Sequence, residues 1–558
     1  MSTIESIDLH VRTYRSALKS TLEVTINSLS SYHLRLNAIL HPHGSDQNTI
    51  DFSALCYTIP RLPSQIDRTY KVIVGQTPEV FSNSGFTNVV SWPSASSVAR
   101  RRTSHFHPRK KLLAMFAASV SDIDDLVNLL IAYQVEWNKF HQLLTARYHS
   151  LATFKKAVKS GQIIADFQFD PVEWSNFLTA LGRMAPLRLR RLYLRSHDLR
   201  LQLLAGSWVD YAKTTQYWWD NITSSTSQFH DISHLPIYFV SSNTHSLVNL
   251  FTGFCLKSKS HILSYLRSNL PDLFSVWQKI TQGDHHLNPN DFLYFASKYL
   301  LKDPLFKQAF RHYQQKTGII TIPSSHYLDS KVQIIPVKKI LTSAHLDPRL
   351  KITRPSKLAQ SAALIVNIDY PLGFAAYHIF NKVLETSGKI RGLYVLGKAA
   401  VLNGEVGDIQ IPRLVFCEHT QNSYIFNNCF NTFFPFTNRQ GSILTNQKAV
   451  SVLGTFLQNE ALIQKYSENN LTVIEMESGP YLGAVTQATY DQPTPKNTIV
   501  DLNSAPFDIG IINYTSDTPY STTRSLGVGN LTLNGVEPTY LSSLAILQRI
   551  IHLEENQN

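Results

Sequence analysis

From about residue 362 onward, short apolar runs alternate with segments of helical periodicity, and this alternation limits the fold more than any other feature of the chain. Runs of strand length and composition occupy residues 364–368, 392–396 and 509–514. Helical segments between such strands are typical of a sheet whose strands lie largely parallel. We therefore predict an α/β domain over residues 361–558, with a mostly parallel or mixed sheet flanked by helices.

The preceding region has another pattern, with apolar residues at helical spacing over long stretches. Ser121, Asp122 and Asp124 supply capping and early acidic side chains before a long helix expected over 126–144. The apolar run 237–240 fits either a strand of a small α/β unit or a buried extended segment. The prediction is a mainly α-helical N-terminal region, divided into a helix and loop-rich segment (1–95), a basic helical domain (96–330) and a connecting region (331–360).

The positive charge of the chain lies in its first two-thirds. Residues 361–558 contain 11 Lys and Arg against 16 Asp and Glu, whereas residues 1–360 contain 41 against 24. A basic surface fits nucleic acid, a phosphorylated ligand or an acidic neighbouring surface. Nucleic acid is therefore a conceivable partner, although no nucleic-acid-binding motif supports it. The alternative for the basic run Arg100-Arg101-Arg102 is ion pairing with Asp122, Asp124 and Glu136.

Other functional classes are disfavoured by what the sequence lacks. No apolar run approaches the roughly 18 residues of a membrane span, and the first ten residues lack a secretion signal pattern. We expect a soluble cytoplasmic protein without a membrane partner. The four cysteines, which are widely spaced and form no CxxC pair, indicate neither a disulfide framework nor a zinc site. We expect no cofactor and no metal.

Carboxylates stand at the ends of two of the expected strands. Glu475 and Glu477 follow the run 473–474, and Asp517 follows the run 511–514. Ligands of open α/β sheets bind beyond the carboxyl ends of strands. These three side chains are therefore the first candidates for a functional site.

Five short motifs in the last 200 residues resemble, in family order, the superfamily of purine nucleoside phosphorylases, uridine phosphorylases and nucleosidases, which includes AMP nucleosidase. The motifs are Asp369-Tyr370-Pro371-Leu372-Gly373, Gly397-Lys398-Ala399-Ala400, Gly407-Asp408-Ile409-Gln410-Ile411-Pro412, Glu475-Met476-Glu477 and Ser516-Asp517. The resemblance implies a nucleoside-phosphorylase-like fold, a homo-oligomer, and cleavage of the N-glycosidic bond of a purine nucleoside or nucleotide.

The resemblance also implies roles for single residues. Met476 would lie against the ribose, and Glu477 would accept hydrogen bonds from its 2′ and 3′ hydroxyls and favour a cationic transition state. Asp517 would protonate the departing base. Glu475 and Gly397 would belong to the substrate-binding surface. The structural alternatives are that these carboxylates only cap helices and that Met476 is core.

One position departs from the family pattern. Gly373 stands where phosphorylases of this superfamily usually carry a phosphate-holding arginine, which favours hydrolysis by water over phosphorolysis. Asp369 or Glu405 would then orient the water. Asp408 is expected to be a turn or cap residue rather than a catalytic one.

Three further residues complete the candidate site. Lys398 and Arg524 would neutralise a 5′-phosphate, unless they are solvated surface charges. His419 would face the base or a neighbouring subunit's site. The alternative to an enzyme is a non-catalytic homo-oligomeric assembly or ligand-binding protein on the same fold.

Overall fold

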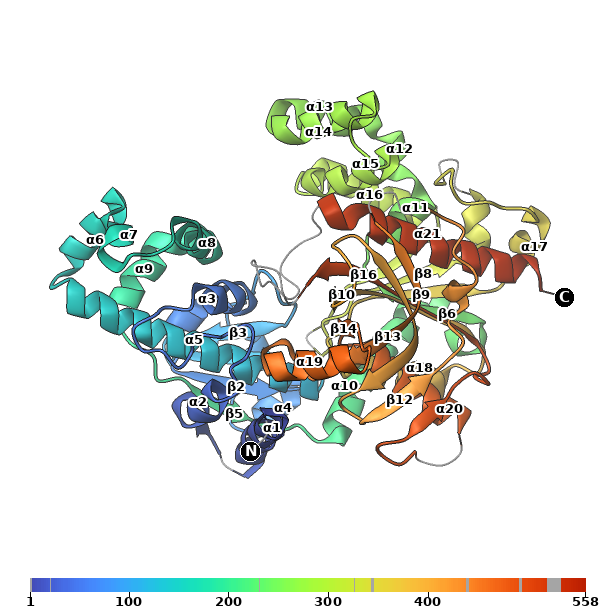
Figure 1. Ribbon diagram of the computed structural model, residues 1–558. Helices are drawn as coiled ribbons and strands as arrows, with labels where there is room; N and C mark the ends of the chain where they lie inside the picture. Colours follow the sequence, from blue (N-terminus) through green and yellow to red (C-terminus); the bar gives the residue numbers. More distant parts are fainter. Residues whose placement is uncertain are drawn as a thin grey trace.

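The computed structural model describes residues 3–20, 22–229, 231–325, 327–342, 346–437, 441–490, 494–518 and 533–557. Within these ranges the chain is a mixed α/β structure built on two sheets. Figure 1 shows the smaller sheet and its helices on the left, in the N-terminal region (residues 3–205), and the larger sheet on the right, in the C-terminal region (residues 208–557). Among the described helices, none combines the length and apolar character that a membrane crossing requires.

The described N-terminal region is mainly helical, as predicted, but it also contains a five-stranded sheet that the prediction did not include. Its strands, in spatial order, are β1 (Val24–Thr25), β5 (Arg200–Leu203), β2 (Lys71–Gly75), β4 (Leu112–Phe116) and β3 (Ser104–His107). The strands are short, and β1 and β5 are far apart in the sequence, so propensity alone does not reveal their pairing. The helices of this region are α1 (Thr3–Ser20), α2 (Ile26–Leu34), α3 (Phe52–Thr58), α4 (Pro78–Asn83), α5 (Val120–Arg147), α6 (Leu151–Ser160), α7 (Gln162–Phe167), α8 (Pro171–Leu181) and α9 (Ala185–Leu194).

The C-terminal region is built on an eleven-stranded mixed sheet. Ten strands follow the order β15 (Ile499–Asp501), β12 (Asn422–Ile425), β11 (Ile409–Cys417), β13 (Ile443–Ser451), β14 (Val473–Glu475), β10 (Ile390–Val401), β6 (Ile237–Ser242), β9 (Leu364–Asp369), β8 (Val332–Pro336) and β7 (Ile320–Ile322). The eleventh, β16 (Asp508–Asp517), pairs parallel with β10 and antiparallel with β11. Since β6, β9, β10 and β16 run parallel, their carboxyl ends share one edge of the sheet.

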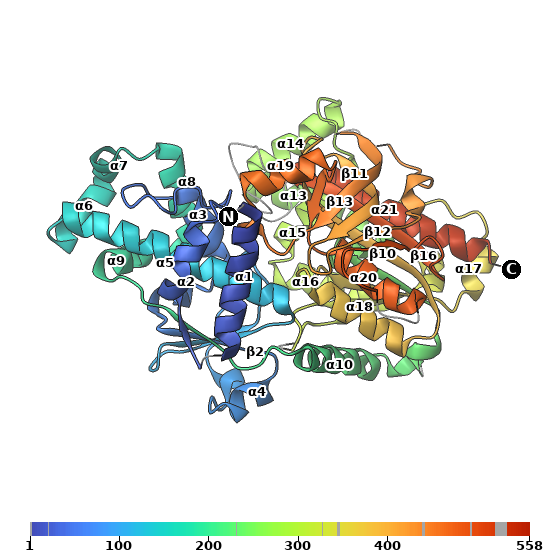
Figure 2. The same cartoon turned by 60° about the horizontal axis from the view of Figure 1, so that its bottom comes forward.

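Helices cover both faces of this sheet, which makes three layers. In β6, Tyr238 and Val240 pack into the core under one helical layer, whereas Ile237 and Phe239 pack into the core under the other. Burial on both faces explains why this strand is continuously apolar. One layer consists of α10 (Trp208–Ser225), α18 (Ala375–Thr386) and α20 (Ser478–Thr489), visible side by side in Figure 2. The other contains α11 (Ser246–Thr252), α12 (Phe254–Lys257), α13 (Lys259–Asn269), α14 (Pro271–Gln282), α15 (Pro289–Leu300), α16 (Pro304–Lys316), α17 (Pro355–Gln360) and α21 (Leu533–Glu555).

The larger sheet crosses the predicted domain boundary at residue 361. Three of its strands, β6, β7 and β8, precede that residue, and β6 lies between β9 and β10. A unit starting at residue 361 would therefore lack a central strand. The run 237–240, for which the sequence left two interpretations, is this strand.

The long helix expected over 126–144 is confirmed as α5. The strand β5 separates α9 from α10, and the helix that precedes β14 is α19 (Glu460–Glu468). Asn459 sets this start, because its side chain accepts a hydrogen bond from the backbone N–H of Leu462.

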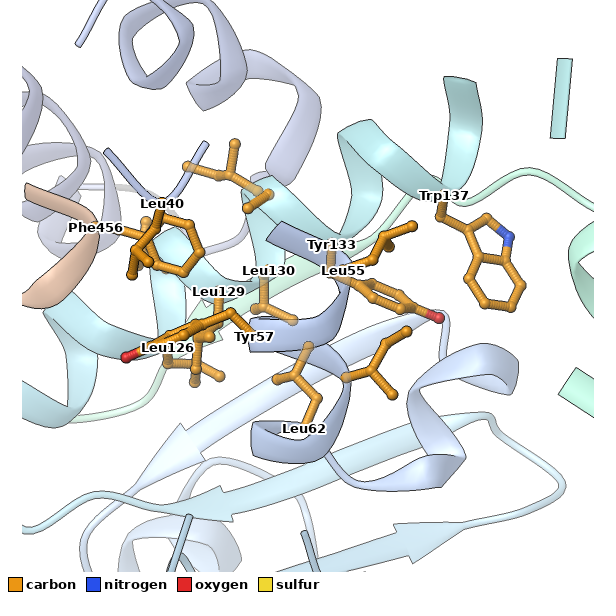
Figure 3. Close-up of a cluster of buried hydrophobic side chains, with 14 of the residues drawn as sticks. Leu40, Leu55, Tyr57, Leu62, Leu126, Leu129, Leu130, Tyr133, Trp137 and Phe456 are labelled. Atoms are coloured by element: carbon orange, nitrogen blue, oxygen red, sulfur yellow. The ribbon is translucent and has the colours of Figure 1, made fainter. Parts of the chain in front are cut away.

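A hydrophobic core continues from the N-terminal region into the segment around α19. Phe456 packs with Leu40, Leu126 and Tyr57 (Figure 3), and the rings of Tyr57 and Phe456 are 5.2 Å apart. The backbone N–H of Ile39 donates to the carbonyl of Gln458 at 2.9 Å. Because apolar side chains from both regions fill one core, the two regions are packed as a single body.

Candidate functional site

A cavity of about 880 Å³ lies where the N-terminal region meets the shared edge of the larger sheet. Residues at the carboxyl ends of β9, β10 and β16 line it, as the edge rule for α/β sheets predicts. The strand β14, which runs antiparallel to β10, also contributes lining residues. The lining residues that the sequence motifs contain are Asp369, Tyr370, Pro371, Leu372, Lys398, Ala399, Ala400, Glu475, Met476, Glu477 and Ser516. Segments spread over nearly the whole C-terminal third thus converge on one space.

Glu477 stands between this cavity and the turn after β9. Its Oε1 accepts a hydrogen bond from the backbone N–H of Gly373 at 3.0 Å. Burial, and next the charge of Glu475, raise the pKa of Glu477 to about 8, while Arg100 acts in the opposite direction. The carboxyl group can therefore carry a proton near neutral pH and release it when a cation approaches.

Glu475 holds the first turn of α20. Its Oε2 accepts hydrogen bonds from the backbone N–H groups of Glu477 and Ser478, both at 2.7 Å, and its Oε1 accepts one from the hydroxyl of Ser451. These hydrogen bonds are those of a helix-capping carboxylate, and Glu475 also belongs to the cavity lining. By fixing the backbone of residue 477, this carboxylate positions the neighbouring glutamate at the cavity.

Asp369, at the carboxyl end of β9, is joined to the N-terminal region. Its Oδ2 lies 2.6 Å from Nη1 of Arg101, and its Oδ1 accepts a hydrogen bond from the backbone N–H of Thr244 at 3.0 Å. Arg101 also donates to the carbonyl oxygen of Tyr370 at 2.7 Å. The predicted water-orienting carboxylate is thus held by an arginine that the motifs did not include.

The N-terminal region also occupies the place of a side chain at Gly373. Gly373 has φ +50°, and a Cβ atom there would lie 2.4 Å from Oγ of Ser121, near the start of α5. Ser121 Oγ accepts a hydrogen bond from the backbone N–H of Phe374 at 2.8 Å. Any side chain at position 373 would have to displace Ser121. Met476 lies beside the same turn, 3.6 Å from that Cβ position, and packs partly against the N-terminal core.

Several predicted site residues lie away from the cavity lining. Asp517 is buried at the end of β16, where its Oδ1 accepts a hydrogen bond from the N–H of Thr518 at 2.8 Å, and its neighbour Ser516 lines the cavity instead. Gly397 allows close approach of β10 and β16, because a Cβ would lie 2.3 Å from Asn513 Oδ1. Arg524 lies outside the described residues.

Three other candidates are placed beside the cavity rather than in its lining. His419 lies against the N-terminal region, with Nε2 3.4 Å from Ser121 Oγ, and burial lowers its pKa to about 3. Asp408 accepts hydrogen bonds from the N–H groups of Glu405 and Ser442, at 2.8 and 2.6 Å, which is the turn role expected for it. Glu405 is exposed in the same turn.

The motifs missed the basic residues that line the cavity from the N-terminal region. These residues are Arg61, Arg100, Arg101 and Arg102. The arginine run at 100–102 was visible in the sequence, but its meeting with the C-terminal carboxylates was not. The expected pairing with acidic residues of α5 is confirmed for Arg102 and Asp122, at 2.8 Å. The other two acidic residues differ, since Asp124 pairs with Arg15 and Glu136 with Lys139.

A model of a protein family, described as "Family of unknown function (DUF6909)", matches residues 26–552. The chain belongs to this family. The matched residues include most of the N-terminal region and most of the C-terminal region. No curated protein matches the chain.

Several solved structures of nucleosidases and phosphorylases resemble part of the chain. An S-adenosylhomocysteine nucleosidase from Streptococcus pyogenes is 10% identical with a TM-score of 0.29, covering 58% of this chain and 98% of its own. A 5′-methylthioadenosine/S-adenosylhomocysteine nucleosidase from Campylobacter jejuni is 10% identical with a TM-score of 0.29, covering 43% and 92%. A uridine phosphorylase from Schistosoma mansoni is 11% identical with a TM-score of 0.27, covering 43% and 80%. Scores this low assign neither a fold nor an activity to the chain.

Proposed function

We propose that this chain cleaves the N-glycosidic bond of a purine nucleoside or nucleotide, with water rather than phosphate as the attacking group. The observation that carries the proposal is the convergence of Asp369, Lys398, Met476 and Glu477 on one cavity. These residues come from three motifs of the nucleoside phosphorylase and nucleosidase resemblance. A chance resemblance gives no reason for them to share a cavity.

Glu477 is the proposed sugar-binding carboxylate. Hydrogen bonds from two ribose hydroxyls, together with positive charge developing on the sugar, would favour its ionised form over the protonated one. A carboxyl whose pKa lies near 8 is suited to this change, because substrate binding can shift its charge at neutral pH. Its fixed contact with Gly373 keeps the group in place.

Two further roles remain part of the proposal. Asp517 is the proposed acid that protonates the departing base, although Ser516 rather than Asp517 lines the cavity. Asp369 is the proposed water-orienting group, with Arg101 fixing the position of its carboxylate. Gly373, which Ser121 crowds, supports hydrolysis, since no arginine stands there to hold an attacking phosphate.

The test is chromatographic detection of free base after incubating the full chain with purine nucleosides and nucleotides, with and without inorganic phosphate. We expect the parent protein to release base without phosphate, and we expect the rate of release to fall about 100-fold or more in Glu477→Gln. Glu385→Gln, an exposed glutamate on α18, is the matched control and should leave the rate unchanged. Release that survives in Glu477→Gln would contradict the role of that residue. Asp517→Asn separately tests whether Asp517 is the acid, and we expect the rate of base release to fall about 100-fold or more in this variant.

A second candidate is ligand binding without cleavage. It is favoured by the position of Asp517 outside the lining and by the engagement of Asp369 with Arg101. Under this alternative, calorimetry detects nucleoside or nucleotide binding that Glu477→Gln weakens, while no substrate of the panel yields free base.

A further inference from the structure

One side of the cavity is basic, and its charges come from separate parts of the chain. Arg61 follows α3, Arg100 and Arg102 lie in the loop before β3, and Lys398 lies near the end of β10. All four line the same cavity. The resemblance assigns Lys398 to a 5′-phosphate, whereas the proposed hydrolysis gives the three arginines no task.

Arg100 and Arg102 are held in the same way. Arg100 donates from Nε and Nη2 to the two carboxylate oxygens of Asp125, at 3.1 and 2.6 Å. Arg102 donates from the same two nitrogens to Oδ1 of Asp122, at 3.1 and 2.8 Å. In both arginines one edge of the guanidinium group is fixed by an aspartate of α5, and Nη1 lies outside that fork.

Arg102 leaves a hydrogen-bond donor unused. The residue is 5% exposed, and its Nη1 is buried and makes no hydrogen bond within the part of the chain that the structure describes. A buried guanidinium donor without an acceptor is unfavourable by about 1–3 kcal/mol or more. Arg102 itself belongs to the cavity lining, next to Arg100 and Arg101.

The basic residues also disfavour each other's charge. The pKa of Lys398 is lowered by burial and next by the charge of Arg61. The pKa of Arg61 is lowered by burial, with Arg100 acting in the same direction. Cations that are brought together in a partly buried place are stabilised by a bound anion.

We propose that Arg61, Arg100, Arg102 and Lys398 form a subsite for a phosphate group, carried by the substrate or free in solution. Guanidinium groups whose orientation is already fixed can donate hydrogen bonds to phosphate oxygens, and a lysine adds a point charge. The inference rests on the proposed function for the position of the sugar. Arg100 is close enough to Glu477 to influence its pKa, so a sugar at Glu477 would have the subsite as its neighbour.

The test measures binding rather than turnover. Calorimetric titrations in a Glu477→Gln background, where cleavage is blocked, compare a purine nucleoside, its 5′-monophosphate and inorganic phosphate. Arg100→Gln and Lys398→Gln remove two cations of the subsite; neither residue is fully buried, and circular dichroism checks their folding. The matched controls are Arg147→Gln, which also removes an aspartate-paired arginine, and Lys448→Gln, an exposed lysine of the same sheet.

We expect the monophosphate to bind at least tenfold more tightly than the nucleoside, and this preference to fall about tenfold in Arg100→Gln and in Lys398→Gln but in neither control. A second outcome is that the monophosphate binds no more tightly than the nucleoside while inorganic phosphate binds and loses affinity in Arg100→Gln and Lys398→Gln. In that case the subsite is supported and its ligand is free phosphate. Equal binding of all variants to every phosphate probe overturns the inference. The two proposals can fail separately. If the parent protein releases base from nucleosides but the titrations show no preference for the monophosphate, the subsite is overturned and the proposed cleavage stands. If the titrations show that preference but the parent protein releases no base, the cleavage is overturned and the subsite stands.

Discussion

Arg101 and Asp369 form an ion pair, with 2.6 Å between Nη1 and Oδ2, that joins the basic loop of the N-terminal region to the carboxyl end of β9. Both residues line the cavity. An arginine far away in the sequence therefore fixes the carboxylate that the motifs place nearest to the site.

A double-mutant cycle of Arg101→Gln and Asp369→Asn measures this ion pair. Arg101 is 45% exposed, so solvent screens the interaction and we expect a coupling energy of about 0.2–1 kcal/mol. The measurement is urea unfolding of the four proteins. A coupling above about 2 kcal/mol would mean that the pair is shielded from water far more than its exposure indicates.

Gly373→Ala should destabilise the protein by about 1–3 kcal/mol, since the new Cβ would meet Ser121 Oγ at 2.4 Å in a backbone with φ +50°. Adding Ser121→Gly should recover the share of the lost unfolding free energy that is due to the clash. It should not recover the share that is due to the strained backbone at position 373. Gly388→Ala, where a Cβ meets nothing within 4 Å, is the control and should be nearly neutral. Thermal unfolding of the parent protein and these three variants separates the contribution of the clash from that of the backbone. A neutral Gly373→Ala would show that the turn relaxes.

Glu477 should make stability fall with rising pH. Its pKa is raised from 4.5 to about 8, so the folded protein binds more protons than the unfolded chain between these values. The contribution of Glu477 to the free energy of unfolding is fully present below pH 4.5. It is lost as the pH rises toward and through 8. Glu477→Gln removes the titration, so its melting temperature should exceed that of the parent protein at pH 8 and approach it at pH 5.

Because Glu477 is partly open to the cavity, we expect the difference at pH 8 to be about 1–2 kcal/mol. Glu385→Gln should show no such divergence between the two pH values. A Glu477→Gln protein that is equally stable relative to the parent at pH 5 and pH 8 would contradict the raised pKa.

A buried chain of polar side chains in the N-terminal region should be sensitive to single changes. His41 Nδ1 lies 3.0 Å from His33 Nε2, and His41 Nε2 lies 2.7 Å from Glu136 Oε1. His41→Gln cannot serve both partners and should destabilise the protein by about 2–4 kcal/mol. His149→Gln, at an exposed position, is the control. A loss below about 0.5 kcal/mol in His41→Gln would show that water replaces the ring.

A fragment of residues 361–558 should not fold alone. It lacks β6, the strand between β9 and β10, and it exposes Phe456 and its apolar neighbours. Calorimetry of the full chain should instead show one cooperative transition, because the regions share a core. A soluble fragment with a cooperative melting transition would contradict this expectation and restore residue 361 as a domain boundary.

The sequence predicted most reliably those features that depend on neighbouring residues. The helix α5 and the strands β9, β10 and β16 follow from local periodicity and capping residues, and they were anticipated. The N-terminal sheet was missed because pairing of β1 with β5 joins Val24 to Leu201, and no local pattern contains that contact. The same limit explains why β6 was left without a sheet.

The site was predicted from one side only. Glu477, Met476, Asp369 and Lys398 could be found because they follow strands in recognisable motifs. Arg102 could be seen as part of a basic run, but only the fold shows that this run meets the cavity. Asp517, the expected acid, is not among the described lining residues, whereas its neighbour Ser516 is, and the register of β10 and β16 shifts at this point.

The core that joins Phe456 to Tyr57 has a consequence for how a ligand enters. Domain closure about a hinge would have to break that packing, so the two walls of the cavity cannot swing apart in each binding cycle at little free-energy cost. The basic wall and the carboxylate wall are therefore set before a ligand arrives, and little ordering of the protein should accompany binding. Association should then follow one-step kinetics, with selectivity expressed mainly in the dissociation rate.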